Sequence, residues 1–136
     1  FALALHTLIL LAHTPGSATS QSLAGGVNTH SSCVRRMLST LGQAGLVDAS
    51  EGRDGGYRLA LPADSITLKD IYCAVANEPL LLTDHRSRAH CPISAAVGPA
   101  INAIVADAEA RFQDALERRT LADVAGSFDG AAAWLR

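Results

Sequence analysis

Two adjacent arginines in a helix-forming stretch are the first side chains of this sequence that suit binding of a charged ligand. Arg35 and Arg36 lie off the apolar face that recurs at spacings of three and four residues from Val34 to Leu41. A guanidinium can bind guanine through two hydrogen bonds or pair with a phosphate. Further polar groups precede the arginines, at Thr29, His30, Ser31 and Ser32. We expect a helix whose N-terminal half carries these groups into the major groove of DNA.

A turn with three glycines follows this helix and carries Arg53 at its tip. An arginine in such a turn is attracted to the negative potential of a narrow minor groove. Gly52, Gly55 and Gly56 are expected to let the backbone approach DNA and to permit positive φ angles. Asp54 opposes DNA binding electrostatically, so we expect it to stabilise the turn or pair with an arginine.

Cys91 is the thiol whose sequence neighbours best suit redox chemistry. Four basic residues precede it closely, namely His85, Arg86, Arg88 and His90. Such groups would lower the pKa of the thiol and make it a candidate redox sensor, through a Cys91–Cys91 bridge or a mixed disulfide. The alternative, a loop cysteine without a role, stays open.

The cysteines are three in number, at 33, 73 and 91. They are too few and too far apart for a disulfide framework, which favours reduced thiols in a cytoplasm. Cys73 has apolar neighbours, so we expect it in the core. The histidines and acidic residues near Cys91 match no established zinc spacing, so no metal site is predicted. Since the sequence also has no phosphate-binding loop, metalloprotease motif or nucleophile elbow, we do not expect an enzyme.

Composition limits the class of protein without deciding its function. A length of 136 residues suits one compact domain or a small domain with an appended helix. Apolar residues make up 49% and aromatics 4%, which predicts a helical core of aliphatic side chains. The first 13 residues are apolar but too short to span a bilayer, so no membrane association is expected. The net charge of −2 gives no support for nucleic-acid binding.

The elements that must position the arginines are three helices and a hairpin. Capping side chains and glycines set their expected ends. The helices are predicted at Phe1–Ala12, at Gln21–Gly25 with a cap at Thr19 or Ser20, and from a cap at Asn28 or Thr29 to about Ala44. The second and third form a helix-turn-helix pattern. The strands are predicted at Leu46–Ser50 and Tyr57–Leu61, and their hairpin makes a wing.

The remainder of the chain is predicted to be helical around one irregular segment. Thr67 and Asp70 are the cap and the acidic partner of a helix over Leu68–Ala76. Residues 77–96 have no regular pattern. A long helix is expected from Pro99, in its first turn, to Arg119. Thr120 then starts a short capped turn that ends at Val124.

The wing and the residues around it resemble the signature of the BadM/Rrf family of bacterial regulators, which includes the iron–sulfur cluster regulator and the nitric-oxide-sensitive repressor. The resemblance rests on Gly52–Ala60 followed by Ile66–Ile71, and on the preceding helix over Val34–Val47. Cys91-Pro92-Ile93 and Thr120–Val124 resemble the two ends of the family's dimerisation region. The likeness extends over nearly the whole chain to about residue 125.

The resemblance implies a homodimer built by crossing long C-terminal helices, and a repressor that binds a roughly palindromic operator in double-stranded DNA. In many members the loop before the long helix holds three cysteines that bind an iron–sulfur cluster. This loop contains Cys91 alone, so no cluster cofactor is expected. The effector, either a small molecule or a redox signal, is not indicated by the sequence.

The expected architecture is therefore mainly α with a two-stranded wing: a winged helix-turn-helix domain plus a long C-terminal dimerisation helix. We assign residues 1–76 to the DNA-binding domain, 77–98 to a sensor or linker loop, 99–125 to the dimerisation region and 126–136 to a flexible tail. The alternative function is a winged-helix protein-interaction module without specific DNA binding, because the charge is modest and Asp54 lies in the wing.

Overall fold

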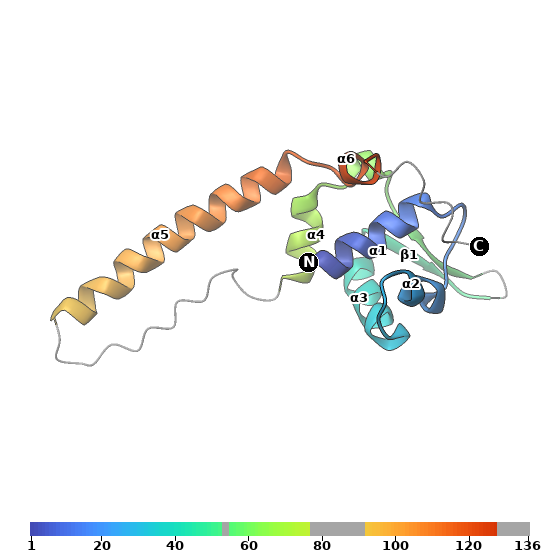
Figure 1. Cartoon of the computed structure of the whole chain (residues 1–136), viewed down its shortest axis with the longest axis horizontal. Coiled ribbons are helices and arrows are strands. Elements are labelled where there is room, and N and C mark those ends of the chain that lie inside the picture. The colour runs from blue at the N-terminus through green and yellow to red at the C-terminus, as the bar shows by residue number, and fades with distance from the viewer. Residues whose placement is uncertain (53–54, 77–91, 128–136) are drawn as a thin grey trace.

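The computed structural model describes residues 1–52, 55–76 and 92–127. These residues form a compact body of short helices with a two-stranded sheet, and one long helix that extends away from it (Figure 1). The elements in chain order are α1 (Ala2–His13), α2 (Ser20–Gly26), α3 (Ser31–Gln43), β1 (Val47–Ser50), β2 (Gly56–Leu59), the 3₁₀ turn η1 (Ala63–Ser65), α4 (Leu68–Val75), α5 (Pro92–Glu117) and α6 (Leu121–Ala125). The predicted mainly α fold with a small wing is confirmed.

The core of the body lies where α1 meets the helices and strand around it. α1 packs against α2, α4, α6 and β2, and it contributes Leu8, which is completely buried. Its one buried polar side chain, Thr7, donates its hydroxyl hydrogen to the Leu3 carbonyl oxygen at 2.9 Å. The other fully buried large apolar residues come from five further segments and are Leu23, Val34, Leu38, Leu41, Ile66, Ile71 and Leu121.

The turn between α2 and α3 differs from the prediction. The Thr19 hydroxyl accepts from the Ser22 N–H at 3.2 Å, which confirms it as the cap of α2. Asn28 instead adopts a left-handed conformation with φ 52°, so neither it nor Thr29 caps the next helix. α3 begins at Ser31 after His30, whose side chain makes no capping bond. Thr29 and His30 therefore precede the helix in which they were expected.

The two strands form an antiparallel hairpin that is fastened to the body by a third segment. Val47 pairs with Leu59 at the base, and Ser50 with Gly56 near the turn. On the other edge of β2, Ala18 and Tyr57 exchange backbone hydrogen bonds of 2.8 and 2.9 Å. The hairpin is thus held from both sides of β2.

The N-termini of α4 and α6 meet in a short backbone pairing. Leu68 N–H donates to the Arg119 carbonyl oxygen at 2.9 Å, and Leu121 N–H donates to the Ile66 carbonyl oxygen at 2.8 Å. Each helix also has a complete capping box, Thr67 with Asp70 and Thr120 with Asp123. Both predicted caps are confirmed, and the residues before α4 are brought beside the residues after α5.

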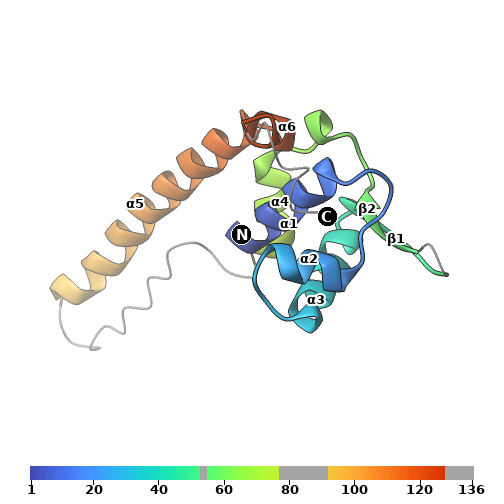
Figure 2. The same ribbon diagram turned by 45° about the vertical axis from the view of Figure 1, so that its right-hand side comes forward.

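α5 is longer than expected and stands clear of the body in both ribbon views (Figures 1 and 2). It begins at Pro92, so residues 92–96 are helical rather than irregular, and Pro99 lies inside the helix instead of in its first turn. A proline in a helix interior removes one backbone hydrogen bond, so the rest of the helix must compensate for it. Within the described ranges, no helix has the length and apolar character needed to cross a membrane.

Candidate nucleic-acid interface

α3 has one face in the core and one face in solvent. Val34, Leu38 and Leu41 are buried at spacings of four and three, and the helix packs on α2, α4 and β1. Arg35 and Arg36 are exposed on the other side. The apolar face was predicted from its spacing, and this packing determines which side chains α3 presents outward.

The predicted polar residues of α3 form a compact group on its first turns. Ser32 is exposed and lies three and four residues before Arg35 and Arg36, so the three share one surface of the helix. Ser31 is partly buried at the first helical position. Ser39, which was not singled out, is also exposed and continues the same surface; its spacing of four from Arg35 is the signal that identifies it.

The start of α3 has a further property that suits an anionic ligand. The His30 side chain makes no capping bond, so no side chain at the N-cap accepts from the N–H groups of the first turn. A phosphate oxygen could bind these N–H groups instead. Cys33 and Val34 donate their N–H groups back to the His30 carbonyl oxygen at 3.0 and 3.2 Å, which starts the helix without a side chain. The first turn also contains no acidic residue that would repel a phosphate.

The wing adds a cation that was not among the predicted contacts. Arg58 lies on β2 with its side chain 65% exposed, and its Nη2 atom is 3.4 Å from Asp48 Oδ2 on β1. Alternation in Tyr57-Arg58-Leu59 is the signal that places Arg58 on the opposite side from its half-buried neighbours. Such an exposed pair is worth little energetically, so Asp48 reduces the local charge without holding Arg58 firmly.

The wing glycines are required by packing. A Cβ atom on Gly56 would lie 2.7 Å from the Ala18 carbonyl oxygen, and one on Gly55 would lie 2.4 Å from the Ser50 carbonyl oxygen. Gly52 has the positive φ, 110°, that was expected of this turn. Gly55 and Gly56 are therefore required by close contacts with the protein's own backbone. Arg53 and Asp54 lie outside the described residues.

The cysteines do not fit a cluster held as in the three-cysteine loop. Cys33 is exposed on α3, within the candidate DNA-binding surface. Cys73 lies on α4 and is exposed, so the expectation that it is a core residue is wrong; the apolar neighbours Ile71 and Tyr72 are buried instead. Cys91 lies outside the described residues. No group of three or more metal-binding side chains occurs in the part of the chain that the structure describes.

Comparison with protein-family models gives one match that spans the described fold. Residues 1–127 match the Rrf2 family, which is described as an iron-dependent transcriptional regulator. Among curated proteins, YwnA of Bacillus subtilis is 29% identical over 124 residues, which cover 90% of this chain and 92% of YwnA. YwgB of the same organism is 27% identical over 130 residues, covering 89% and 78%. Both carry the name of an HTH-type transcriptional regulator.

Two solved structures show a similar arrangement of elements. CymR of B. subtilis, described as a global cysteine regulator, is 26% identical with a TM-score of 0.64, and the match covers 93% of this chain and 92% of CymR. IscR of T. potens is 22% identical with a TM-score of 0.63, and the match covers 91% of this chain and 81% of IscR. At this identity the match shows a similar fold only. The winged-helix fold class predicted from the sequence is confirmed.

Proposed function

The chain belongs to the Rrf2 family of transcriptional regulators, and we propose that it acts as a homodimeric repressor on a palindromic operator. Family membership makes it a regulator of transcription and not an enzyme. The observation that carries the finer proposal is the exposed Ser32, Arg35 and Arg36 surface on a helix-turn-helix. We propose that it acts in the cytoplasm, where a bacterial regulator of transcription meets the chromosome.

We assign sequence reading to the first turns of α3. Arg35 and Arg36 are suited to bidentate bonds with guanine, while Ser31 and Ser32 are suited to phosphate oxygens and base edges. Thr29 and His30, in the turn before α3, are proposed as backbone contacts. The wing, with Arg53 and Arg58, is proposed to lie along the neighbouring phosphates, close to the minor groove.

The homodimer is proposed from the apolar face of α5. Phe112 and Leu116 on this face are partly buried against the body, whereas Ile101 and Ile104 are 39% and 69% exposed. A helix of 26 residues is about 39 Å long, enough to reach a second copy while still attached to its own body. Burial of these isoleucines against the same face of a second α5 gives a two-fold dimer. Two-fold symmetry is what a palindromic operator matches.

A response to a thiol-redox or small-molecule signal is part of the same proposal. Residues 77–98, which include Cys91, are assigned to sensing because they connect the DNA-binding residues 1–76 with the dimerisation region, 99–125. The exposed thiol of Cys33 lies on α3, so mass spectrometry of oxidised protein must distinguish the two cysteines. Oxidation that releases DNA through Cys33 in a Cys91→Ser variant would contradict the assignment to Cys91.

The test of DNA reading compares arginine variants on one duplex. A duplex selected by the wild-type protein from a randomised pool is used, and binding is followed by fluorescence anisotropy at fixed salt. Arg35→Ala should weaken binding by about ten- to hundredfold and relax the base preference at one position of each half-site. Arg118→Ala, an exposed arginine at the end of α5, is the matched control and should change binding little.

Unchanged affinity and unchanged base preference in both Arg35→Ala and Arg36→Ala would contradict the assigned surface. The other function to distinguish is a protein-interaction module, which is favoured by the net charge of −2 and by the Asp48–Arg58 pair in the wing. Such a module would select no duplex even at low salt, where phosphate contacts are strongest.

A further inference from the structure

α5 is attached to the body mainly through one side of α4. Among the described elements, α4 is the one against which α5 makes extensive contact. The contacts lie in the last third of α5, while its first two turns are far from the body in Figures 1 and 2. The direction of the long helix relative to α3 is therefore set at a single place.

Three kinds of contact build this attachment, which we term the α4–α5 joint. The ring of Tyr72 meets the ring of Phe112 edge to face, with centroids 5.2 Å apart and an interplanar angle of 82°. Lys69 Nζ lies 2.9 Å from Glu117 Oε2. The backbone pairing of Thr67 with Thr120 then fixes the chain just beyond the end of α5. The joint is defined as these six residues.

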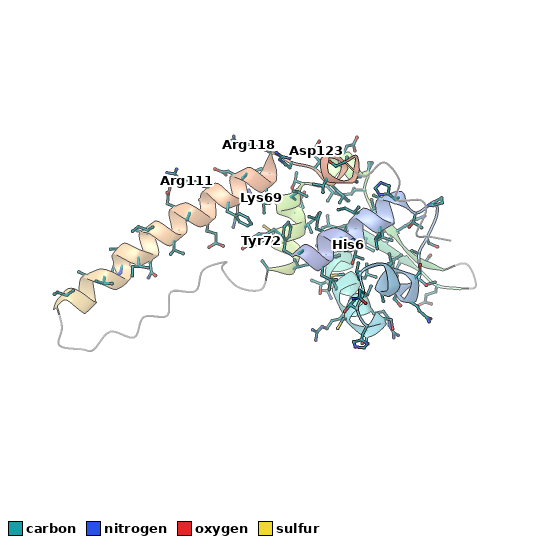
Figure 3. The ribbon with its side chains drawn as sticks, viewed as in Figure 1. His6, Lys69, Tyr72, Arg111, Arg118 and Asp123 are labelled. Atoms are coloured by element: carbon teal, nitrogen blue, oxygen red, sulfur yellow. The ribbon has the colours of Figure 1, made fainter. Side chains whose placement is uncertain are left out.

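Glu117 favours the charged form of Lys69. The hydrogen bond from Lys69 to Glu117 and the negative charge of Glu117 raise the pKa of Lys69 above its ordinary value. The Lys69 side chain is 33% exposed, so this pair is more enclosed than Arg58–Asp48 in the wing, and its contribution to stability remains small. Tyr72 is only 5% exposed, and a second ring contact, with Phe1 at 5.9 Å, holds it from the side of α1. Figure 3 shows Lys69 and Tyr72 on α4, which lies between α1 and α5.

An adjacent side of α4 packs against α3, the helix proposed to read DNA. Leu68 and Ile71 are buried in the same core as Val34, Leu38 and Leu41 of α3, and the two helices pack together. Lys69 and Tyr72 are three residues apart and lie about a quarter of a turn around α4 from this side. α4 is consequently the rigid piece between α5 and α3, and a change of angle at the joint moves α3 as a whole.

A small rotation at this joint is large on the scale of DNA. α3 has 13 residues and is about 20 Å long, so a rotation of about 10° about one of its ends moves the other end by about 3.5 Å. One base pair of spacing displaces a half-site by about 3.4 Å and turns it by about 35° around the duplex. Selection between two neighbouring spacings thus requires the joint to be held within a few degrees.

We propose that the α4–α5 joint, through the Tyr72–Phe112 ring contact and the Lys69–Glu117 pair, determines which half-site spacing the dimer accepts. The inference rests on the proposed dimeric DNA binding. It makes Tyr72, Phe112, Lys69 and Glu117 positioning residues that set operator specificity without touching a base. They act by fixing the distance and the angle between the two α3 helices of the dimer.

The experiment uses the full chain and a series of duplexes. Each duplex carries the two half-sites selected by the wild-type protein, with the spacer shortened by one base pair, unchanged, or lengthened by one or two. The wild-type protein should prefer one spacing by about tenfold or more. Tyr72→Ala should bind all four duplexes within about threefold of one another, while its mass in solution remains that of a dimer. Tyr72→Phe, which keeps the ring contact, should retain the wild-type preference.

Two further variants guard against misfolding and general effects of charge. Glu117→Gln removes the ion pair at the surface without opening the core, and it should broaden the spacing preference in the same direction as Tyr72→Ala. Arg111→Ala removes an exposed pair with Asp107 inside α5, next to Phe112 but outside the joint, and should leave the preference sharp. If Tyr72→Ala and Glu117→Gln both retain a sharp wild-type spacing preference, the inference is overturned and the proposed function still stands. Failure of the wild-type protein to bind any paired half-sites would instead overturn the proposed function and this inference with it.

Discussion

Gly56 determines how close the wing lies to the rest of the protein. The Ala18 backbone approaches so closely that a methyl group at residue 56 would meet its carbonyl oxygen at 2.7 Å. The same strand residue pairs with Ser50, whose hydroxyl lies 3.3 Å from the Gly56 nitrogen and accepts its N–H. Because Gly56 has no side chain, β2 can pair with Ser50 on one edge and lie against the Ala18 backbone on the other.

Gly56→Ala is predicted to lower the free energy of unfolding by about 1–3 kcal/mol, because the new methyl group must displace backbone on the Ala18 side. Urea denaturation measures the change. Gly25→Ala is the matched control: it lies in α2, has open space around it and no positive φ, and should stabilise the protein by about 0.5–1 kcal/mol. Equal behaviour of the two variants would contradict the packing argument.

At the residue scale the sequence was most informative where chemistry is local. The exposed positions of Arg35 and Arg36 followed from the spacing of their apolar neighbours. Cys73 was misjudged because its apolar neighbours were taken as a guide, although the one-residue step from Tyr72 turns it out to solvent. Arg58 was not singled out, although the alternation of Tyr57-Arg58-Leu59 already places it on the exposed side of β2; its pairing with Asp48 appears only in the structure.

At the scale of elements, the capping box of α6 gives the fold a stability that depends on pH. Asp123 accepts the Thr120 N–H at 2.8 Å, and this backbone hydrogen bond, with the Thr120 hydroxyl, lowers the pKa of the carboxyl group. A lowered pKa in the folded state means that the carboxylate stabilises the fold above its ordinary value of 3.8. That contribution is lost as the pH falls through the lowered value.

Asp123→Asn is therefore predicted to be less stable than the wild type at pH 7, with a difference that shrinks as the pH is lowered below about 4. Thermal unfolding at pH 7, 4 and 3 checks this. Asp107→Asn removes a carboxylate on the exposed part of α5 and controls for the change in net charge. A stability difference that is the same at all three pH values would contradict the role of the ionised cap.

The ends of helices could be predicted where they depend on contacts between residues close together in the sequence. The caps at Thr19, Thr67 and Thr120 are side-chain to backbone bonds within three residues, so the sequence alone indicated them. The start of α3 follows Asn28 in the left-handed conformation, which Asn tolerates, although the sequence also allows Asn28 to be a helix cap. Pro99 was taken as a helix start, whereas α5 starts at Pro92 and continues through Pro99. The preference of proline for the first helical position suits both residues, so it could not decide between them.

At the scale of the whole molecule, α5 carries large apolar side chains, Ile101 and Ile104, that stay exposed in the single chain. Ile104→Asp places a charge on the exposed apolar face and should convert a dimer of about twice 14.1 kDa into a monomer, because a buried carboxylate in the helix pair would be strongly unfavourable. Multi-angle light scattering measures the mass. Thermal unfolding of the body should change little, since residue 104 contacts solvent in the single chain.

Ala106→Asp is the matched control for this change. Residue 106 is exposed and lies two positions along the same helix, which turns it about 200° away from Ile104. It should leave the mass of the dimer unchanged. A monomeric wild-type protein, or equal effects of both substitutions, would contradict the proposed helix pair. Loss of operator binding by Ile104→Asp but not by Ala106→Asp would support a dimer as the DNA-binding species.

The pairing of Thr67 with Thr120 has a consequence for the topology of the chain. After α5 the polypeptide returns within a hydrogen bond of the residues that precede α4, since Leu121 donates to Ile66. α6 thereby completes the hydrophobic body around α1. A minimal monomeric fragment should keep α6, because a stop after residue 76 would strip the buried Leu121 from its site. A linker that splices residue 76 to residue 120 has to run back along the eight residues of α4, which is about 12 Å.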